Sequence, residues 1–262
     1  MKRGLFLCAQ CRRQVSITSG TIFQDSRLPL ILWFRAMWYI TNEKNGASAL
    51  SVQRVLGLGS YQTAWTWLHN LRRAMVRPGR ERLGGRIEVD ETYLGGLEEG
   101  SRGRKTGNKA LIAVAAQEDG PRIGRIRLRR VKDASVDSLH SFIVDTVEPD
   151  SIVLTDGWPG YVGINQKGYK HEVRILRKQK ASELLPRVHL VISLLKRWLM
   201  GTHQGAVSYA HLDYYLDEFT FRFNRRTSRS RGKLFYRLVQ QAVCVEHTTY
   251  RAMVKPQAIG LG

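Results

Sequence analysis

The chain has 262 residues, of which 43% are hydrophobic, and this is enough to bury a core in one large domain or two smaller ones. That composition excludes a disordered tail. The sequence has no run of about 18 apolar residues, so no membrane span is predicted. Three cysteines in a chain of this length argue against a disulfide scaffold and indicate a reducing compartment. The start, MKRGLFLCAQC, lacks the long apolar stretch of a signal peptide.

Charge is the strongest bulk signal. Lys and Arg number 42 and Asp and Glu number 22, which leaves a formal net charge of +20. Basic residues occur throughout the chain, for example in RIGRIRLRR (122–130) and FNRRTSRSRGK (223–233). Such an excess predicts a polyanionic partner, most often nucleic acid, although an ordinary basic protein is the simpler alternative.

Residues 1–25 contain one Cys-x-x-Cys, at Cys8 and Cys11, followed by short β-prone pieces. Residues 26–78 are expected to be helical, with a first helix that begins near Pro29. A helix over about 47–56, a turn at 57–59 and a second helix over about 61–75, capped by Ser60, match the helix-turn-helix pattern. A plain helical hairpin is the alternative. Under the DNA-binding interpretation, the second helix would contact DNA through Gln62, Thr66 and Arg72.

Residues 79–250 are predicted to form one α/β domain, followed by a tail over 251–262. Strands are expected at 86–95, 109–117, 124–132 and 150–157, and helices at 135–147, 185–201, 208–226 and 232–243. Three strands, a helix, a strand and further helices fit a mixed sheet covered by helices.

Two aspartates in this domain favour a metal site. In the strand GGRIEVDETYLGG (84–96), alternation places Glu88 and Asp90 on one face and Glu91 on the other. Asp156 ends the apolar strand SIVLTDG, and strand ends are where α/β sheets place ligands. Two carboxylates that meet need a cation, and a pair of Mg²⁺ ions about 4 Å apart serves phosphodiester chemistry. Alternatively, each Asp is a turn residue.

The helix 185–201 carries His189 and Lys196 on one face, about 10 Å apart along its axis. A neutral imidazole can bind metal and the ammonium group can bind phosphate, so this face could complete the site. A solvated or structural histidine is the commoner situation.

The motifs IEVDETYLGG, TDGWPGYVG and HLVISLLKRWLMGTHQGAVSYAHLDYYLDEFTFRFNRR resemble those of bacterial insertion-sequence transposases. The resemblance is closest to the group with an ISXO-like domain, the IS fifteen-ninety-five family, and covers nearly the whole chain. It implies a zinc-ribbon-like element, a helical DNA-binding region and a ribonuclease H-like catalytic domain. It also implies DNA cleavage and strand transfer at transposon ends with two Mg²⁺ or Mn²⁺ ions.

By the same resemblance, the first two acids of the DDE-type catalytic set match Asp90 and Asp156. The third position, which is usually Glu or Asn and is His in one subgroup, falls on His189, and the basic residue seven positions later falls on Lys196. Glu183 and Glu218 remain rivals for the third position, and Glu88 and Glu91 are expected to support the site or to be solvated. Two other functions stay open: a catalytically inactive DNA-binding remnant, and a metal-dependent nuclease of the same fold.

The implied partners are double-stranded DNA, both terminal inverted repeats and target, and further copies of the chain in a dimer or higher oligomer. Arg197, Arg225 and Arg226 are expected to contact the DNA backbone. Cys8 and Cys11 make only half of a four-ligand zinc site, so an N-terminal truncation is expected and bound Zn²⁺ is not. A bacterial, nucleoid-associated cytoplasmic location follows.

Overall fold

The computed structural model describes residues 5–76, 79–95, 109–175, 181–203 and 207–254. It divides into two compact units: Met1–Pro78 together with Ser228–Gly262, and Gly79–Thr227. Within the described residues, no helix combines the length and the apolar character needed to cross a bilayer.

The first unit is mainly helical. Its elements are β1 (Leu5–Leu7), β2 (Gln14–Ser16), α1 (Leu30–Asn42), α2 (Ala49–Leu56), α3 (Tyr61–Ala74), α8 (Arg231–Ala242) and α9 (Tyr250–Val254). As predicted, Ser60 caps α3 by accepting a hydrogen bond from the Thr63 N–H, and Gly57, with φ of +63°, ends α2 in the left-handed conformation. The core of this unit includes Trp33 stacked on Trp67, with ring centroids 4.0 Å apart.

Helix α8 belongs to a different core from the one expected. The sequence analysis placed residues 232–243 in the α/β domain, whereas the structure groups α8 with α1. Phe235 on α8 packs edge-on against Phe34 and Trp38 of α1, and Leu238 is fully buried. An amphipathic pattern shows that a helix has a partner but not which one, so the sequence could not separate these possibilities.

The second unit contains a five-stranded sheet of order β5-β4-β3-β6-β7. The strands are β3 (Arg86–Leu94), β4 (Ala110–Asp119), β5 (Arg122–Val131), β6 (Ile152–Thr155) and β7 (Lys170–Val173). β3, β4 and β5 are antiparallel, whereas β6 and β7 run parallel to β3. This order and these directions are those of a ribonuclease H-like fold, as the resemblance implied. β7 was not predicted, because a short, mostly exposed edge strand has no apolar run.

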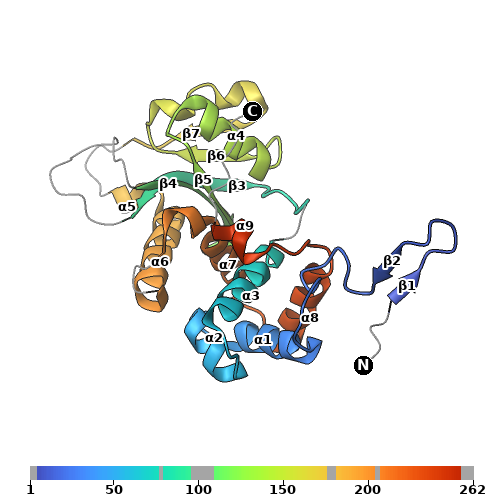
Figure 1. Cartoon of the computed structure of the whole chain (residues 1–262). Helices are drawn as coiled ribbons and strands as arrows, with labels where there is room; N and C mark the ends of the chain where they lie inside the picture. Colours follow the sequence, from blue (N-terminus) through green and yellow to red (C-terminus); the bar gives the residue numbers. More distant parts are fainter. Residues whose placement is uncertain (1–4, 77–78, 96–108, 176–180, 204–206, 255–262) are drawn as a thin grey trace. The chain divides into compact units, whose positions relative to one another are not determined.

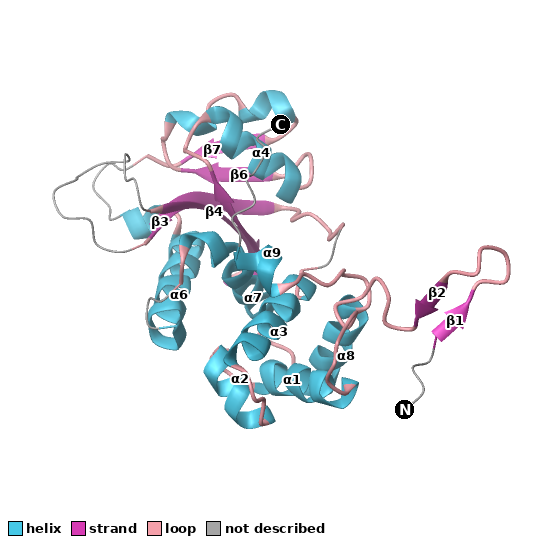
Figure 2. Ribbon diagram, viewed as in Figure 1, coloured by secondary structure: helices cyan, strands magenta, loops and turns pink. Residues whose placement is uncertain are grey.

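Helices cover both faces of the sheet (Figures 1 and 2). One face packs against α6 (Pro186–His203) and α7 (Leu212–Asn224), preceded by α5 (Ala181–Leu184) and the short 3₁₀ turn η3 (Tyr209–His211). The other packs against α4 (Val136–Thr146) and the 3₁₀ turns η1 (Pro159–Tyr161) and η2 (Ile164–Lys167). The central strand β3 therefore contributes side chains to two separate cores.

Candidate active site

Asp90 and Asp156 lie side by side on neighbouring parallel strands. In the register of β3 and β6, Arg86 pairs with Ile152 and Glu88 with Leu154. Continuing that register by two residues places Asp90 beside Asp156, which directly follows β6. Adjacent strands are about 4.8 Å apart, and paired residues point to the same face. This register places the two carboxylates next to each other at the end of β6.

His189 reaches Asp90 from α6. Its Nε2 lies 3.7 Å from Asp90 Oδ2, and the two side chains are 31% and 14% exposed. The other Asp90 oxygen, Oδ1, accepts the N–H of Glu91 at 2.9 Å, which restrains the carboxylate. The packing of α6 on β3 thus brings two predicted metal ligands together at a solvent-accessible position.

The chemistry of this pair fits a divalent cation. Metal-to-ligand bonds are about 2.0–2.2 Å long, so one ion between atoms 3.7 Å apart can contact both. Asp156 uses Oδ1 to accept the Trp158 N–H at 3.0 Å, and a carboxylate has a second oxygen to offer. No three His, Cys, Asp or Glu side chains among the described residues are already arranged tightly enough to bind an ion. The site therefore has an Asp–His pair, and Asp156 is the adjacent carboxylate in the strand register.

The rival residues differ in their surroundings. Glu218 is fully buried and paired with Arg222, whose Nε and Nη2 both lie 2.8 Å from Glu218 Oε1. The two residues are four apart on α7, so their side chains lie on one side of the helix. Glu183 is exposed on the short helix α5. His189, by contrast, has its Nε2 3.7 Å from Asp90 Oδ2.

Lys196 and Arg197 are exposed further along α6. Lys196 lies two turns beyond His189, about 10 Å along the helix axis, on the same side. The helix therefore presents two exposed cations beyond His189.

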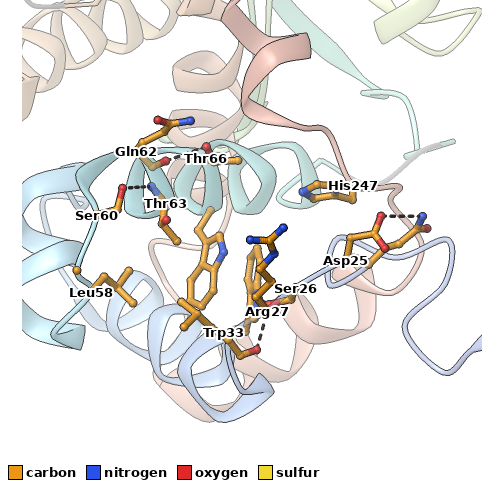
Figure 3. A pocket seen from close by; sticks show the side chains of 14 residues that line it. Asp25, Ser26, Arg27, Trp33, Leu58, Ser60, Gln62, Thr63, Thr66 and His247 are labelled. Carbon is orange, nitrogen blue, oxygen red and sulfur yellow. Dashed lines mark hydrogen bonds between the residues drawn. The ribbon is translucent and has the colours of Figure 1, made fainter. Parts of the chain in front are cut away.

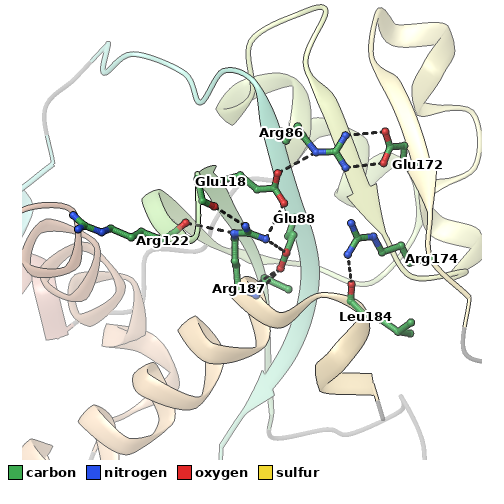
Figure 4. A network of polar contacts seen from close by, with 10 residues as sticks. Arg86, Glu88, Glu118, Arg122, Glu172, Arg174, Leu184 and Arg187 are labelled. Atoms are coloured by element: carbon green, nitrogen blue, oxygen red, sulfur yellow. Dashed lines mark hydrogen bonds and ion pairs between the residues drawn. The ribbon is translucent and has the colours of Figure 1, made fainter. Parts of the chain in front are cut away.

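The two glutamates of β3 are on opposite faces, and neither is simply solvated. Glu88 is fully buried and accepts the backbone N–H groups of Arg187 and Val188, at 2.7 and 2.9 Å. Figure 4 shows it within a network of arginines and glutamates. A carboxylate in the middle of an apolar strand needs a buried partner, and this is the sequence signal for the role of Glu88.

Glu91 accepts a hydrogen bond of 2.6 Å from the hydroxyl of Tyr161 on the other face. Tyr161 is fully buried, and burial raises its pKa well above 10.0. Neighbouring carboxylates raise this pKa further, those of Glu91, Asp90 and Asp156. The phenol therefore stays neutral and donates, tying the turn after Asp156 to the residue after Asp90.

The predicted DNA-contacting residues of α3 are not presented together. Gln62 is exposed at the start of α3. Thr66 is 9% exposed and donates its hydroxyl hydrogen to the Gln62 carbonyl at 2.8 Å. Arg72 is 1% exposed and donates to the Ala47 carbonyl at 3.4 Å. The C-terminal half of α3 is thus a core helix, and burial withdraws Thr66 and Arg72 from a DNA-facing surface.

A cavity of about 470 Å³ lies at the N-terminal end of α3 (Figure 3). Polar side chains line it, including Arg27, Ser60, Gln62, Thr63 and His247. The first turn of α3, where Gln62 is exposed, is therefore the part of this helix that is open to a ligand.

Arg225 and Arg226 fold back onto their own chain. The Arg225 guanidinium lies 4.1 Å from the Phe221 ring centroid, and that of Arg226 lies 4.0 Å from the Phe223 ring centroid. Arg226 also donates to the Phe223 carbonyl at 2.8 Å, and burial lowers its pKa. Part of their donor capacity is thus used within the protein.

Cys8 and Cys11 lie at the turn of the β1–β2 hairpin, and both are exposed. The Cys8 N–H donates to the Arg13 carbonyl at 2.9 Å, which closes the turn. A backbone hydrogen bond from Cys11, with a smaller contribution from its side chain, lowers the pKa of the Cys8 thiol. This favours the thiolate, the form that binds metal.

Residues 82–224 match the ISXO2-like transposase domain, which is more than half of the chain. Over 248 residues the chain is 25% identical to an uncharacterized protein in transposable element ISH50 of Halobacterium salinarum, covering 87% of this chain and 80% of that protein. The BIV integrase catalytic core is a weaker structural match, with a TM-score of 0.37 and 15% identity over 56% of this chain and 86% of its own. The Mos1 strand transfer complex matches with a TM-score of 0.32 and 12% identity, covering 80% of this chain and 78% of its own. Since this domain match spans more than half of the chain, the protein belongs to the ISXO2-like transposase family.

Proposed function

We propose that the chain cleaves DNA at the ends of its transposable element and transfers the resulting strands to target DNA. The observation that supports this best is the Asp90–His189 pair, which lies beside Asp156 in the strand register. It occurs in a domain that matches the ISXO2-like transposase family. The alternatives of an inactive remnant and a general nuclease have no observation of their own in their favour.

In this proposal Asp90, Asp156 and His189 bind the divalent ions. When bound, the ions would lower the pKa of the attacking group and stabilise charge on the leaving oxygen. Mg²⁺ and Mn²⁺ both suit oxygen ligands, and the imidazole favours Mn²⁺.

The chain's own residues orient the DNA. Lys196 and Arg197 on α6 are placed to contact phosphates close to the carboxylates, and Gln62 is placed to reach DNA from the first turn of α3. Many such cationic contacts position a duplex without reading its sequence. We further propose that two or more copies assemble on the paired transposon ends.

The test is strand cleavage of a duplex that carries the element's terminal inverted repeat, with Asp90→Asn and Asp156→Asn. Each change keeps the side-chain size but removes a charged ligand, so cleavage should fall by about 100-fold or more. DNA affinity should stay within about threefold, since phosphate contacts by Lys and Arg supply most of it.

Asp150→Asn is the matched control. Asp150 is exposed, and its φ of +64° suits Asn as well as Asp. It should cleave like the parent. A parent chain that binds the repeat but leaves it intact in both Mg²⁺ and Mn²⁺ would establish the inactive remnant instead.

A further inference from the structure

We infer that Glu88 is a positioning residue of the active site: its buried carboxylate fixes the start of α6 so that His189 meets Asp90. The inference rests on the proposed function, because it assigns Asp90 and His189 as metal ligands. Glu88 lies two residues before Asp90 on the same face of β3, and its side chain is fully buried.

The first N–H groups of an α-helix have no partner within the helix. In α6 the first residue, Pro186, has no N–H, so Arg187 and Val188 carry the first two. Both donate to one oxygen of Glu88, Oε2, at 2.7 and 2.9 Å. The next N–H, that of His189, already bonds within the helix region, to the Leu185 carbonyl at 3.1 Å. Glu88 thus takes the part of an N-cap side chain, supplied from a strand about a hundred residues earlier.

The Arg187 side chain completes the arrangement around the same carboxylate (Figure 4). Its Nη1 lies 3.1 Å from Glu88 Oε1 and 2.8 Å from Glu118 Oε1 on β4. Its Nη2 donates to the Gly120 carbonyl at 2.8 Å. The buried charge is therefore balanced, and the start of α6 is joined to β3 and to the turn after β4.

Stability alone does not explain a carboxylate here. Replacing a buried ion pair with well-packed apolar side chains is often neutral or stabilising. Apolar packing of α6 on Ile112 and Val114 of β4 supplies burial, but a smooth apolar surface does not specify where a helix sits along its axis. Two directed N–H contacts to one oxygen do specify it.

This placement decides the geometry at His189. One residue of a helix corresponds to a rise of 1.5 Å and a rotation of about 100°. His189 follows Val188 directly. An axial shift of about 1 Å at the start of α6 would therefore move the His189 ring by nearly the same amount. A displacement of this size at an active site can lower the reaction rate by about 100-fold. The 3.7 Å Asp90–His189 pair therefore depends on the contacts of Glu88.

The experiment measures Mn²⁺ binding to the full chain without DNA, from the electron paramagnetic resonance signal of free Mn²⁺. Glu88→Gln keeps the size of the side chain but replaces one oxygen with an NH₂ group, which faces either the N–H groups of α6 or the Arg187 guanidinium, donor against donor. Glu88→Asp keeps the charge but is one methylene too short to maintain both N–H contacts. Both variants should bind Mn²⁺ at least about tenfold more weakly than the parent.

Glu118→Gln is the matched control. It removes one negative charge from the same network, and with it the contacts of Glu118 to Arg187 and Arg86, but leaves the N–H groups of α6 untouched. It should bind Mn²⁺ like the parent. Thermal unfolding midpoints show whether each variant is folded. The Mn²⁺ affinity of a Glu88 variant counts in the comparison when its midpoint is close to that of Glu118→Gln.

Parent-like Mn²⁺ affinity in a folded Glu88→Asp or Glu88→Gln chain would overturn the inference. Asp90→Asn separates this failure from failure of the proposed function. If Asp90→Asn loses Mn²⁺ binding while the Glu88 variants retain it, only the positioning role is wrong. If Asp90→Asn also binds normally, the metal site itself is wrong.

Discussion

At the scale of single residues, His189 as the proposed third ligand would distinguish this site from one with three carboxylates. A site of two Asp and one His has one less negative charge, and imidazole is a softer ligand than carboxylate. Mg²⁺ binding should therefore be weaker here than Mn²⁺ binding. The 31% exposure of His189 leaves its ring accessible to an ion.

We predict that the parent chain cleaves faster in Mn²⁺ than in Mg²⁺ and that His189→Ala loses activity in both. His189→Glu should retain or gain Mg²⁺-dependent cleavage, because it supplies an oxygen ligand from the same helix position. Cleavage rates of the three chains, measured across concentrations of each metal, check this. If His189→Ala is as active as the parent in both metals, His189 is structural and Glu183 becomes the residue to test.

Two other histidines of the unit Gly79–Thr227 predict that folding stability depends on pH. Burial lowers the pKa of both His140 and His171 from 6.5, and His171 Nε2 shares a 2.8 Å hydrogen bond with the Thr155 hydroxyl. Both are neutral in the folded state where the unfolded chain would bind protons. The stability they contribute is thus present above pH 6.5 and is lost as the pH falls toward their folded values.

The thermal unfolding midpoint of the parent should therefore fall as the pH is lowered below 6.5. His171→Gln removes one titrating group and keeps a partner for Thr155, so its midpoint should depend less on pH over the same range. Identical slopes for the two chains would show that His171 does not contribute to the acid response.

At the scale of elements, β3, the turn after β6 and α6 together supply the residues of the proposed site. The three acids of β3 have separate surroundings: Glu88 contacts α6, Asp90 contacts His189, and Glu91 contacts Tyr161 in η1. The turn from Asp156 to Tyr161 also packs closely at Gly160, which is buried. A Cβ at Gly160 would lie 2.5 Å from the Ala134 carbonyl oxygen.

We predict that Gly160→Ala destabilises the chain by about 1–3 kcal/mol, because a backbone oxygen cannot move aside as a side chain can. It should also reduce cleavage by displacing Asp156. Gly157→Ala is the control in the same turn, since among the described residues its Cβ would meet Ile175 Cγ1 at an ordinary 3.8 Å. Denaturant unfolding of both variants provides the measurement, and equal free energies of unfolding would contradict the prediction.

At the scale of the whole molecule, the net charge of +20 is the feature that bears on DNA. Neutralised phosphates release counterions, so the log of affinity should fall linearly with the log of salt concentration, by about a thousandfold or more between about 50 and 200 mM. Lys196→Ala and Arg197→Ala should each reduce the slope by about one unit. Binding titrations at several salt concentrations test this, and a flat response would remove nucleic acid as the main partner.

The sequence by itself determined the local features of this protein. Period-two and helical patterns predicted β3 to β6 and most helices, and Ser60 caps α3 as expected. The metal-site hypothesis at Asp90 and Asp156 also came from the sequence, since strand alternation and strand ends are encoded by residues close together in the chain. Sequence motifs were likewise enough to indicate the family that the domain match established.

Only the tertiary structure decided the partners of residues far apart in the chain. It placed α8 against α1, buried Arg72 in the helical unit and added β7 at the edge of the sheet. It also brought Arg187 to Glu88, which turns an unexplained acid into a contact at the start of α6. Amphipathic patterns and charges state that a residue needs a partner, whereas the packing of the whole chain selects which distant group provides it.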